Sequence, residues 1–183
     1  ASRFDLFSIP VSERIMGMQL IETVELASAA SSIEFTSIPQ DGVDLVLKFS
    51  LRASDTGGYS YIDLALNGSS SNFSSVFLRA NVQQATPVTS GSQTYQIEAG
   101  TTGDGATAST FANGEITISN YASSAAKSYS ADSVTENNST TASLAITAGL
   151  WNNTSAITSL ELSLTPYNFL QYSSASLYKI TAD

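Results

Sequence analysis

The chain is built from short stretches in which apolar and polar residues alternate. Between residues 160 and 165 the alternation is strict, so that Leu160, Leu162 and Leu164 point to one face of an extended segment. Such a period-2 pattern is typical of a half-buried β-strand. Pro166 follows, and because proline cannot donate a hydrogen bond to a sheet, the strand is expected to end there.

The same pattern in residues 44–53 predicts a second strand of this kind. Its inward positions are Leu45, Leu47, Phe49 and Leu51, and its outward positions are Val46, Lys48, Ser50 and Arg52.

A third stretch of this kind lies just before residue 150. Leu144, Ile146 and Ala148 share one parity, and by the same argument we expect them to form the buried face of a strand.

Further alternating stretches lie between residues 20 and 134, and the segment from Ser174 runs almost to the end of the chain. They bring the expected number of strands to nine to eleven, separated by loops rich in Ser, Thr, Gly and Asn. No 3.6-residue period persists long enough to indicate a helix. We therefore predict an all-β, antiparallel two-sheet β-sandwich, and a jelly-roll-like order is favoured over an immunoglobulin-like one.

The N-terminal segment lacks this regular alternation. We predict a short extended arm over residues 1–19 and the β-sandwich domain over residues 20–183. The apolar side chains of the arm are candidate partner-binding residues: Phe4, Leu6, Phe7 and Ile9. They either bury against a neighbouring subunit or cover the core of their own domain.

Composition removes several classes of function. The 183 residues include no Cys and no His, so the sequence predicts no disulfide, thiolate or Ser-His chemistry, no ordinary zinc site and no cofactor. A formal charge of −9 disfavours nucleic acid as a partner. There is neither a leader-like start nor an apolar run of membrane-spanning length, so we expect no membrane association.

Carboxylates and aromatic residues are the remaining candidates for chemistry. A pair of acids could hydrolyse glycans. Most of the sixteen acids, however, occupy outward strand parity, where solvation is the simpler explanation; these include Glu34, Asp63, Glu98, Glu115 and Glu161. The loop residues Asp41, Asp44, Asp55 and Asp104 read as turn residues rather than calcium ligands. We therefore expect no enzyme, no catalytic residues and no metal site.

Several aromatic residues lie in or beside loops or on outward parity: Tyr59, Tyr61, Trp151, Tyr167 and Tyr172. They either present rings to a glycan or receptor, or cap the core or fill a subunit interface. Trp151 and Tyr167 are taken as the candidate partner-binding residues among them.

Four stretches carry a resemblance to a protein family. They are IETVELASAASSIEFTSIPQDGVDLVLKFSLR from Ile21, YIDLALNGSSSNFS, GEITISNYASSAAKSYSAD and GLWNNTSAITSLELSLTPYNFLQYSSASLYKI. In this order they resemble jelly-roll-like structural proteins of tailed bacteriophages, many from marine and cyanobacterial hosts. The family ending usually adds a Gly-Ile or similar dipeptide after SLY, whereas this chain continues with Lys179-Ile180.

The resemblance implies a sandwich on the outer surface of a virion, made in the host cytoplasm and commonly assembled as a homotrimer. Related modules resemble both capsid decoration proteins and tail-fibre tips. The short stretch before the sandwich favours a decoration or cement protein that binds the major capsid protein or other virion subunits. The alternative is the receptor-binding tip of a short tail or head fibre that recognises host surface glycans.

Overall fold

The computed structural model describes residues 16–81, 88–136 and 142–182, and every regular element in these ranges is a β-strand. Twelve strands are present, one more than the largest number expected. They are β1 (Met16–Glu25), β2 (Ser32–Phe35), β3 (Asp44–Leu51), β4 (Tyr59–Leu66), β5 (Phe73–Asn81), β6 (Val88–Gln93), β7 (Gln96–Thr102), β8 (Ala112–Ile118), β9 (Lys127–Glu136), β10 (Ala142–Trp151), β11 (Leu160–Ser163) and β12 (Ser174–Ala182). The predicted all-β class is confirmed.

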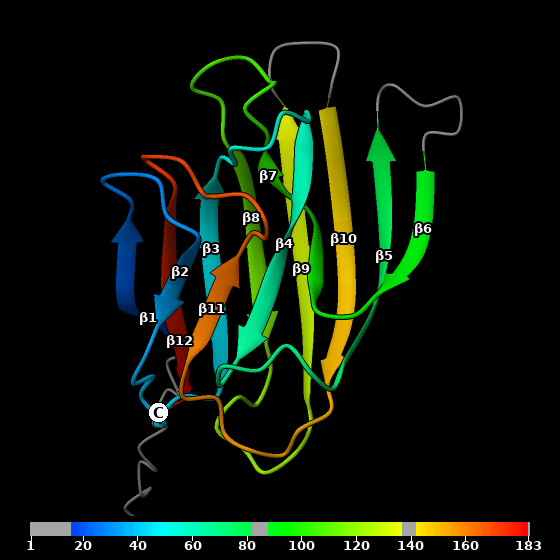
Figure 1. The fold of residues 1–183 in the computed structure, drawn as a ribbon. Coiled ribbons are helices and arrows are strands. Elements are labelled where there is room, and N and C mark those ends of the chain that lie inside the picture. Colours follow the sequence, from blue (N-terminus) through cyan, green and yellow to red (C-terminus); the bar gives the residue numbers. More distant parts are fainter. Residues whose placement is uncertain (1–15, 82–87, 137–141, 183) are drawn as a thin grey trace, which may run out of the picture.

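The strands form two sheets that face each other, as Figure 1 shows. The larger sheet has eight strands in the order β1-β12-β3-β8-β9-β10-β5-β6, and the smaller has four in the order β2-β11-β4-β7. The pairings within each sheet are antiparallel. The predicted two-sheet antiparallel sandwich is therefore confirmed.

Eight of the strands pair in a nested order. Leaving aside β5, β6, β9 and β10, the first strand pairs with the last (β1 with β12), the second with the seventh (β2 with β11), the third with the sixth (β3 with β8) and the fourth with the fifth (β4 with β7). This is a long hairpin rolled over two facing sheets, which is a jelly-roll arrangement.

The other four strands widen only the larger sheet. β5 and β6 form one added hairpin, β9 and β10 form another, and β10 pairs with β5, which joins the two hairpins. In Figure 1 the strands β10, β5 and β6 extend sideways beyond the smaller sheet. The widened part of the sheet is the region in which the candidate site lies.

The hydrophobic core lies between the two sheets. Leu160, Leu162 and Leu164 are buried there, as their alternation predicts. The inward parity predicted for β3 is also correct, since Leu45, Leu47, Phe49 and Leu51 are buried. Because these strands lie where the two layers overlap, an inward apolar side chain always meets the opposite sheet.

Two of the predicted outward positions in the β3 segment are buried, since Val46, although it keeps its outward parity, is only 7% exposed. Arg52 is 6% exposed, and its guanidinium donates to the backbone oxygens of Thr107 and Thr110 and contacts the Asp104 carboxylate at 3.2 Å. The loop that precedes β8 folds over this guanidinium and supplies the polar partners that permit its burial.

The expected boundary between arm and sandwich falls inside a strand. β1 pairs with β12 from Met16 onward, so the ladder begins before residue 20. Phe4, Leu6, Phe7 and Ile9 lie outside the described residues.

Candidate functional site

The outer face of the larger sheet carries large apolar side chains on three neighbouring strands, β9, β10 and β5. Each of these side chains is between 38% and 60% exposed. They are Val76 and Leu78 of β5, Val134 of β9, and Leu144, Ile146 and Leu150 of β10. We call this group the β10–β5 end of the outer face.

The strand register brings these residues into direct contact range. Ile146 lies opposite Leu78, and Leu144 lies between Val134 on one side and Ala80 on the other. Side chains that stand opposite each other in an antiparallel pair have Cβ atoms about 5 Å apart. The side chains therefore form one continuous surface rather than scattered exposed residues.

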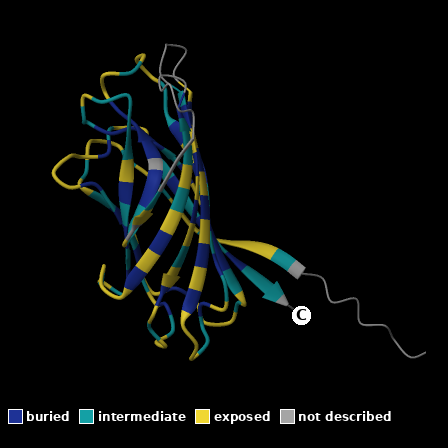
Figure 2. Cartoon of the chain, turned by 90° about the vertical axis from the view of Figure 1, so that its right-hand side faces the viewer, coloured by how far each residue is buried: buried dark blue, intermediate teal, exposed yellow. Residues whose placement is uncertain are grey.

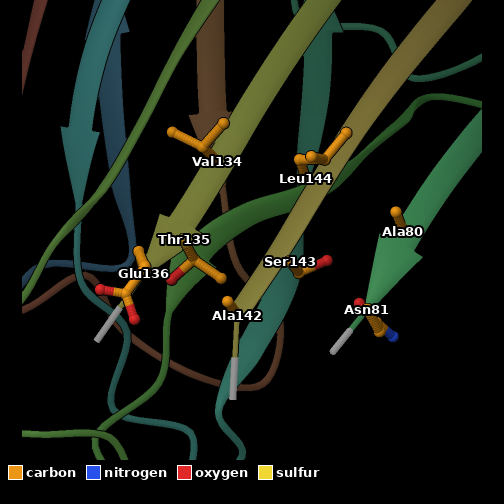
Figure 3. Close-up of a pocket in the computed structure, with 8 residues that line it drawn as sticks. All are labelled: Ala80, Asn81, Val134, Thr135, Glu136, Ala142, Ser143 and Leu144. Atoms are coloured by element: carbon orange, nitrogen blue, oxygen red, sulfur yellow. The ribbon is translucent and has the colours of Figure 1, made fainter. Parts of the chain in front are cut away.

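An open hollow lies at one end of this surface. It has a volume of about 430 Å³, and Figure 3 shows its lining where β5, β9 and β10 meet. The lining includes Ala80, Val134, Ala142 and Leu144, with Glu136 at its margin. Such a hollow can receive an apolar side chain from a partner.

The prediction that Leu144, Ile146 and Ala148 face the core is wrong. All three are exposed on the outer face, while the alternate positions Ser143 and Thr147 are buried. A period-2 pattern separates two faces, and it does not say which of them is covered.

The inward positions of these strands are unusually polar. Those that are buried include Ser75 and Asn81 of β5, and Ser133 and Thr135 of β9. Some have partners within the sandwich, since Asn81 Nδ2 donates to Tyr59 Oη at 2.7 Å and Ser133 Oγ donates to the Glu98 backbone oxygen at 2.6 Å. In this part of the sheet the buried side therefore mixes polar residues with core residues such as Phe73, Tyr129 and Trp151, while large apolar side chains are exposed on the other side.

A buried ion pair belongs to the same polar interior. Arg79 contacts the Glu98 carboxylate, and its guanidinium carbon lies 5.2 Å from the centre of the Tyr59 ring. Glu98 is only 3% exposed, so the expectation that it is a solvated outward residue is wrong. The pair joins β5 of an added hairpin to β7 of the smaller sheet, so a charged contact lies between the two sheets.

The aromatic candidates do not gather into one site. Trp151 is 1% exposed and packs against Phe73, with the ring centres 6.2 Å apart. It is a core residue and cannot present its ring to a partner, because β10 turns it inward. Tyr167 is 42% exposed, in the segment between β11 and β12. Figure 1 places that segment at the opposite end of the sandwich from the end of β10.

The four loop aspartates each engage a protein group. Asp104 pairs with Arg52 and Asp41 with Lys179, while Asp55 and Asp44 accept backbone N–H groups. In residues 16–81, 88–136 and 142–182 no group of three or more His, Cys, Asp or Glu side chains is placed to hold a metal ion.

Lys127 has a shifted pKa that follows from a structural role. Its side chain is fully buried, and its Nζ donates to the backbone oxygens of Ser123, Ala125 and Ser155 at 2.6 to 2.8 Å. Burial lowers the pKa of Lys127. The ammonium group holds two loops together at the lower end of the sandwich, which is a structural role.

Comparison with known proteins adds no relative: no family model, curated protein or solved structure matches the chain. Among the described residues there is no helix with the length and apolar character needed to cross a membrane. Within the described structure, the exposed apolar side chains of the β10–β5 end are the feature for which we seek a function.

Proposed function

We propose that the chain is a structural protein of a tailed-bacteriophage virion, a capsid decoration or cement protein that stabilises the head shell as a homotrimer. The observation that carries this proposal is the exposed apolar surface on β9, β10 and β5. Soluble monomers rarely expose a continuous apolar patch larger than a few hundred Å², and such patches mark sites of association.

The sequence resemblance supports the phage context of the proposal. Its two longest continuous stretches run from Ile21 to Arg52 and from Gly149 to Ile180, and the second is the most specific. These stretches include β2, β3, β11 and β12 of the jelly roll. The proposed location is the outer surface of the virion, with the major capsid protein as the principal partner.

The proposed role uses two different parts of the chain. The sandwich supplies contacts between copies, and the apolar residues Phe4, Leu6, Phe7 and Ile9 bind the shell. A cement protein of this kind needs no catalytic residue, because it acts by burying surface between subunits that internal DNA pressure would separate.

Deletion of residues 1–11 tests the attachment step. β1 begins at Met16, so the deletion leaves the described strands intact. We expect the truncated protein to fold and to lose co-sedimentation with phage heads that lack the native copy. A matched control replaces Ser2, Asp5 and Ser8 with Ala and should still bind. Full binding by the truncated protein would contradict the proposal.

The second candidate function is that of a receptor-binding fibre tip. It is favoured by exposed tyrosines, since Tyr61, Tyr167 and Tyr172 are 43%, 42% and 63% exposed. Exposed aromatic rings stack on sugars, and two of these residues share the connection between β11 and β12. Under this alternative, Tyr167→Ala reduces phage adsorption without altering particle stability, whereas under the decoration role adsorption is unchanged.

A further inference from the structure

The outer face of the larger sheet has a second apolar group at its opposite edge. Met18 and Leu20 of β1 are 46% and 52% exposed. They lie opposite Ile180 and Tyr178 of β12, which are half-buried. We call these four residues the β1–β12 end of the outer face.

The two apolar ends are separated by a polar middle. One continuous row across the sheet shows this, and its members from β1 to β5 are Leu20, Tyr178, Val46, Thr117, Ser130, Ala148 and Val76. In the next row, Lys48 pairs with Glu115, and Asp132 lies opposite Glu115 on β9. The face therefore reads apolar, polar, apolar from β1 to β5, and beyond β5 the edge strand β6 places Ser92 opposite Val76.

The two ends are too far apart to form a single patch. β1 and β10 are separated by five strand spacings, which amounts to about 24 Å. A small partner cannot cover both ends at once, so each end requires its own contact.

From this arrangement we propose that the β10–β5 end of each copy packs against the β1–β12 end of the next copy, so that three larger sheets face a common axis. The inference rests on the homotrimer of the proposed function. A ring of three requires two different surfaces that complement each other, whereas a patch that contacts itself produces a two-fold dimer. The outer face provides two such surfaces, one at the β1 edge and one on β9, β10 and β5, next to the edge strand β6.

Charge permits two copies to meet at these ends. Each chain carries a formal charge of −9, yet none of the ten side chains that define the two ends is charged. The centres of the contact therefore bring together no charged side chain, while Asp132 and Glu136 lie beside the β10–β5 end, where they can stay in contact with water. The remaining repulsion between acidic copies is screened by salt.

The dimensions suit a subunit contact. The β10–β5 end spans three strands and the six residue spacings from Leu144 to Leu150 of β10, or about 280 Å² in projection. That is an appropriate apolar centre for an interface that buries about 800 Å² per partner, with the surrounding serines and threonines as its polar rim. Figure 2 shows the paired ends of β1 and β12 standing away from the rest of the body, where a neighbour can reach them.

Cross-linking of the soluble protein tests the contact directly. The chain has no Cys, so a Leu20→Cys, Ile146→Cys double variant carries one thiol at each end. With a short bis-maleimide we expect covalent trimers, three times 19.2 kDa. A mixture of the two single variants should give linked dimers only, and each single variant alone should give none. The matched control is the Leu20→Cys, Ser163→Cys double variant, whose second thiol lies on the smaller sheet. It should not form cross-linked species.

Three results would overturn the inference. They are a single-chain mass in solution at low and high salt, a trimer whose double variant does not link, and dimers formed by Ile146→Cys alone, which would indicate a two-fold contact. The readout does not depend on phage heads. A linked trimer that fails to bind heads therefore rejects the decoration role alone, and head binding without the link rejects this contact alone.

Discussion

Ile146 of β10 and Leu78 of β5 lie directly opposite each other, and both point away from the core with 58% and 55% of their surface exposed. On the buried side of the same strands Thr147 and Asn81 are polar, while Trp151 belongs to the core. A strand pair that exposes large apolar side chains side by side is expected to have another partner in the assembled state.

Replacing both residues with threonine should separate the oligomer without unfolding the chain. Threonine keeps the β-branched shape that strands favour, while its hydroxyl lowers the gain from burial. We expect Ile146→Thr, Leu78→Thr to sediment as a single chain with a nearly unchanged melting temperature. Ala65→Thr on the smaller sheet is the matched control and should leave the mass unchanged. Retention of the oligomer by the double variant would contradict the proposed interface.

Trp151 is expected to matter for stability rather than for recognition. It is almost completely buried against Phe73, so Trp151→Ala should cost about 3–5 kcal/mol of unfolding free energy. The exposed Tyr167→Ala should change that free energy by less than about 0.5 kcal/mol. Urea unfolding followed by circular dichroism compares the two, and equal effects would show that the assigned burial is wrong.

The Arg79–Glu98 pair should be sensitive to loss of one partner. Arg79→Met removes a cation beside a carboxylate whose side chain is 4% exposed, and breaking a buried pair in this way costs about 3–5 kcal/mol. Adding Glu98→Gln should recover part of the loss, because the uncompensated charge is then removed. Chemical denaturation of the two variants checks this, and a double variant less stable than Arg79→Met would argue against it.

The Asp41–Lys179 pair predicts a specific pH dependence. The hydrogen bond from Lys179 holds the pKa of Asp41 below its ordinary value of 3.8. The stabilisation from this group is thus fully present above pH 3.8 and is lost as the pH falls through the lower folded-state pKa. The stability difference between the protein and Asp41→Asn should be constant near neutral pH and should shrink below pH 3.8. A stability difference that grows as the pH falls below 3.8 would contradict this assignment of the Asp41–Lys179 pair.

The sequence predicts the layers of this fold better than the side of each strand that is covered. Leu160, Leu162 and Leu164 are assigned correctly because the two sheets of the jelly roll overlap there, so their inward side is covered. Ile146 and Leu144 show the same period, but their parity is that of the outer face, and β7 of the smaller sheet packs against the other face of β10. Which face is covered depends on this contact between distant parts of the chain, and the local pattern does not contain it.

The burial of Glu98 could not be read from the sequence for a similar reason. Its cation, Arg79, lies 19 positions earlier in the chain, on the other sheet. The position of Glu98 in the alternating pattern does not show that an opposite charge lies beside its side chain in the fold. A sequence signal for the outer face does exist, since Ser143 and Thr147 of β10, like Ser75 and Asn81 of β5, are more polar than core positions usually are.

Cryo-electron microscopy of purified virions that carry this protein is the most direct test of the decoration role. The account predicts many copies in icosahedral register on the head, grouped in threes with the larger sheets turned toward each local three-fold axis. A few copies confined to the tail or to protruding fibres, or no copies on the particle, would contradict it.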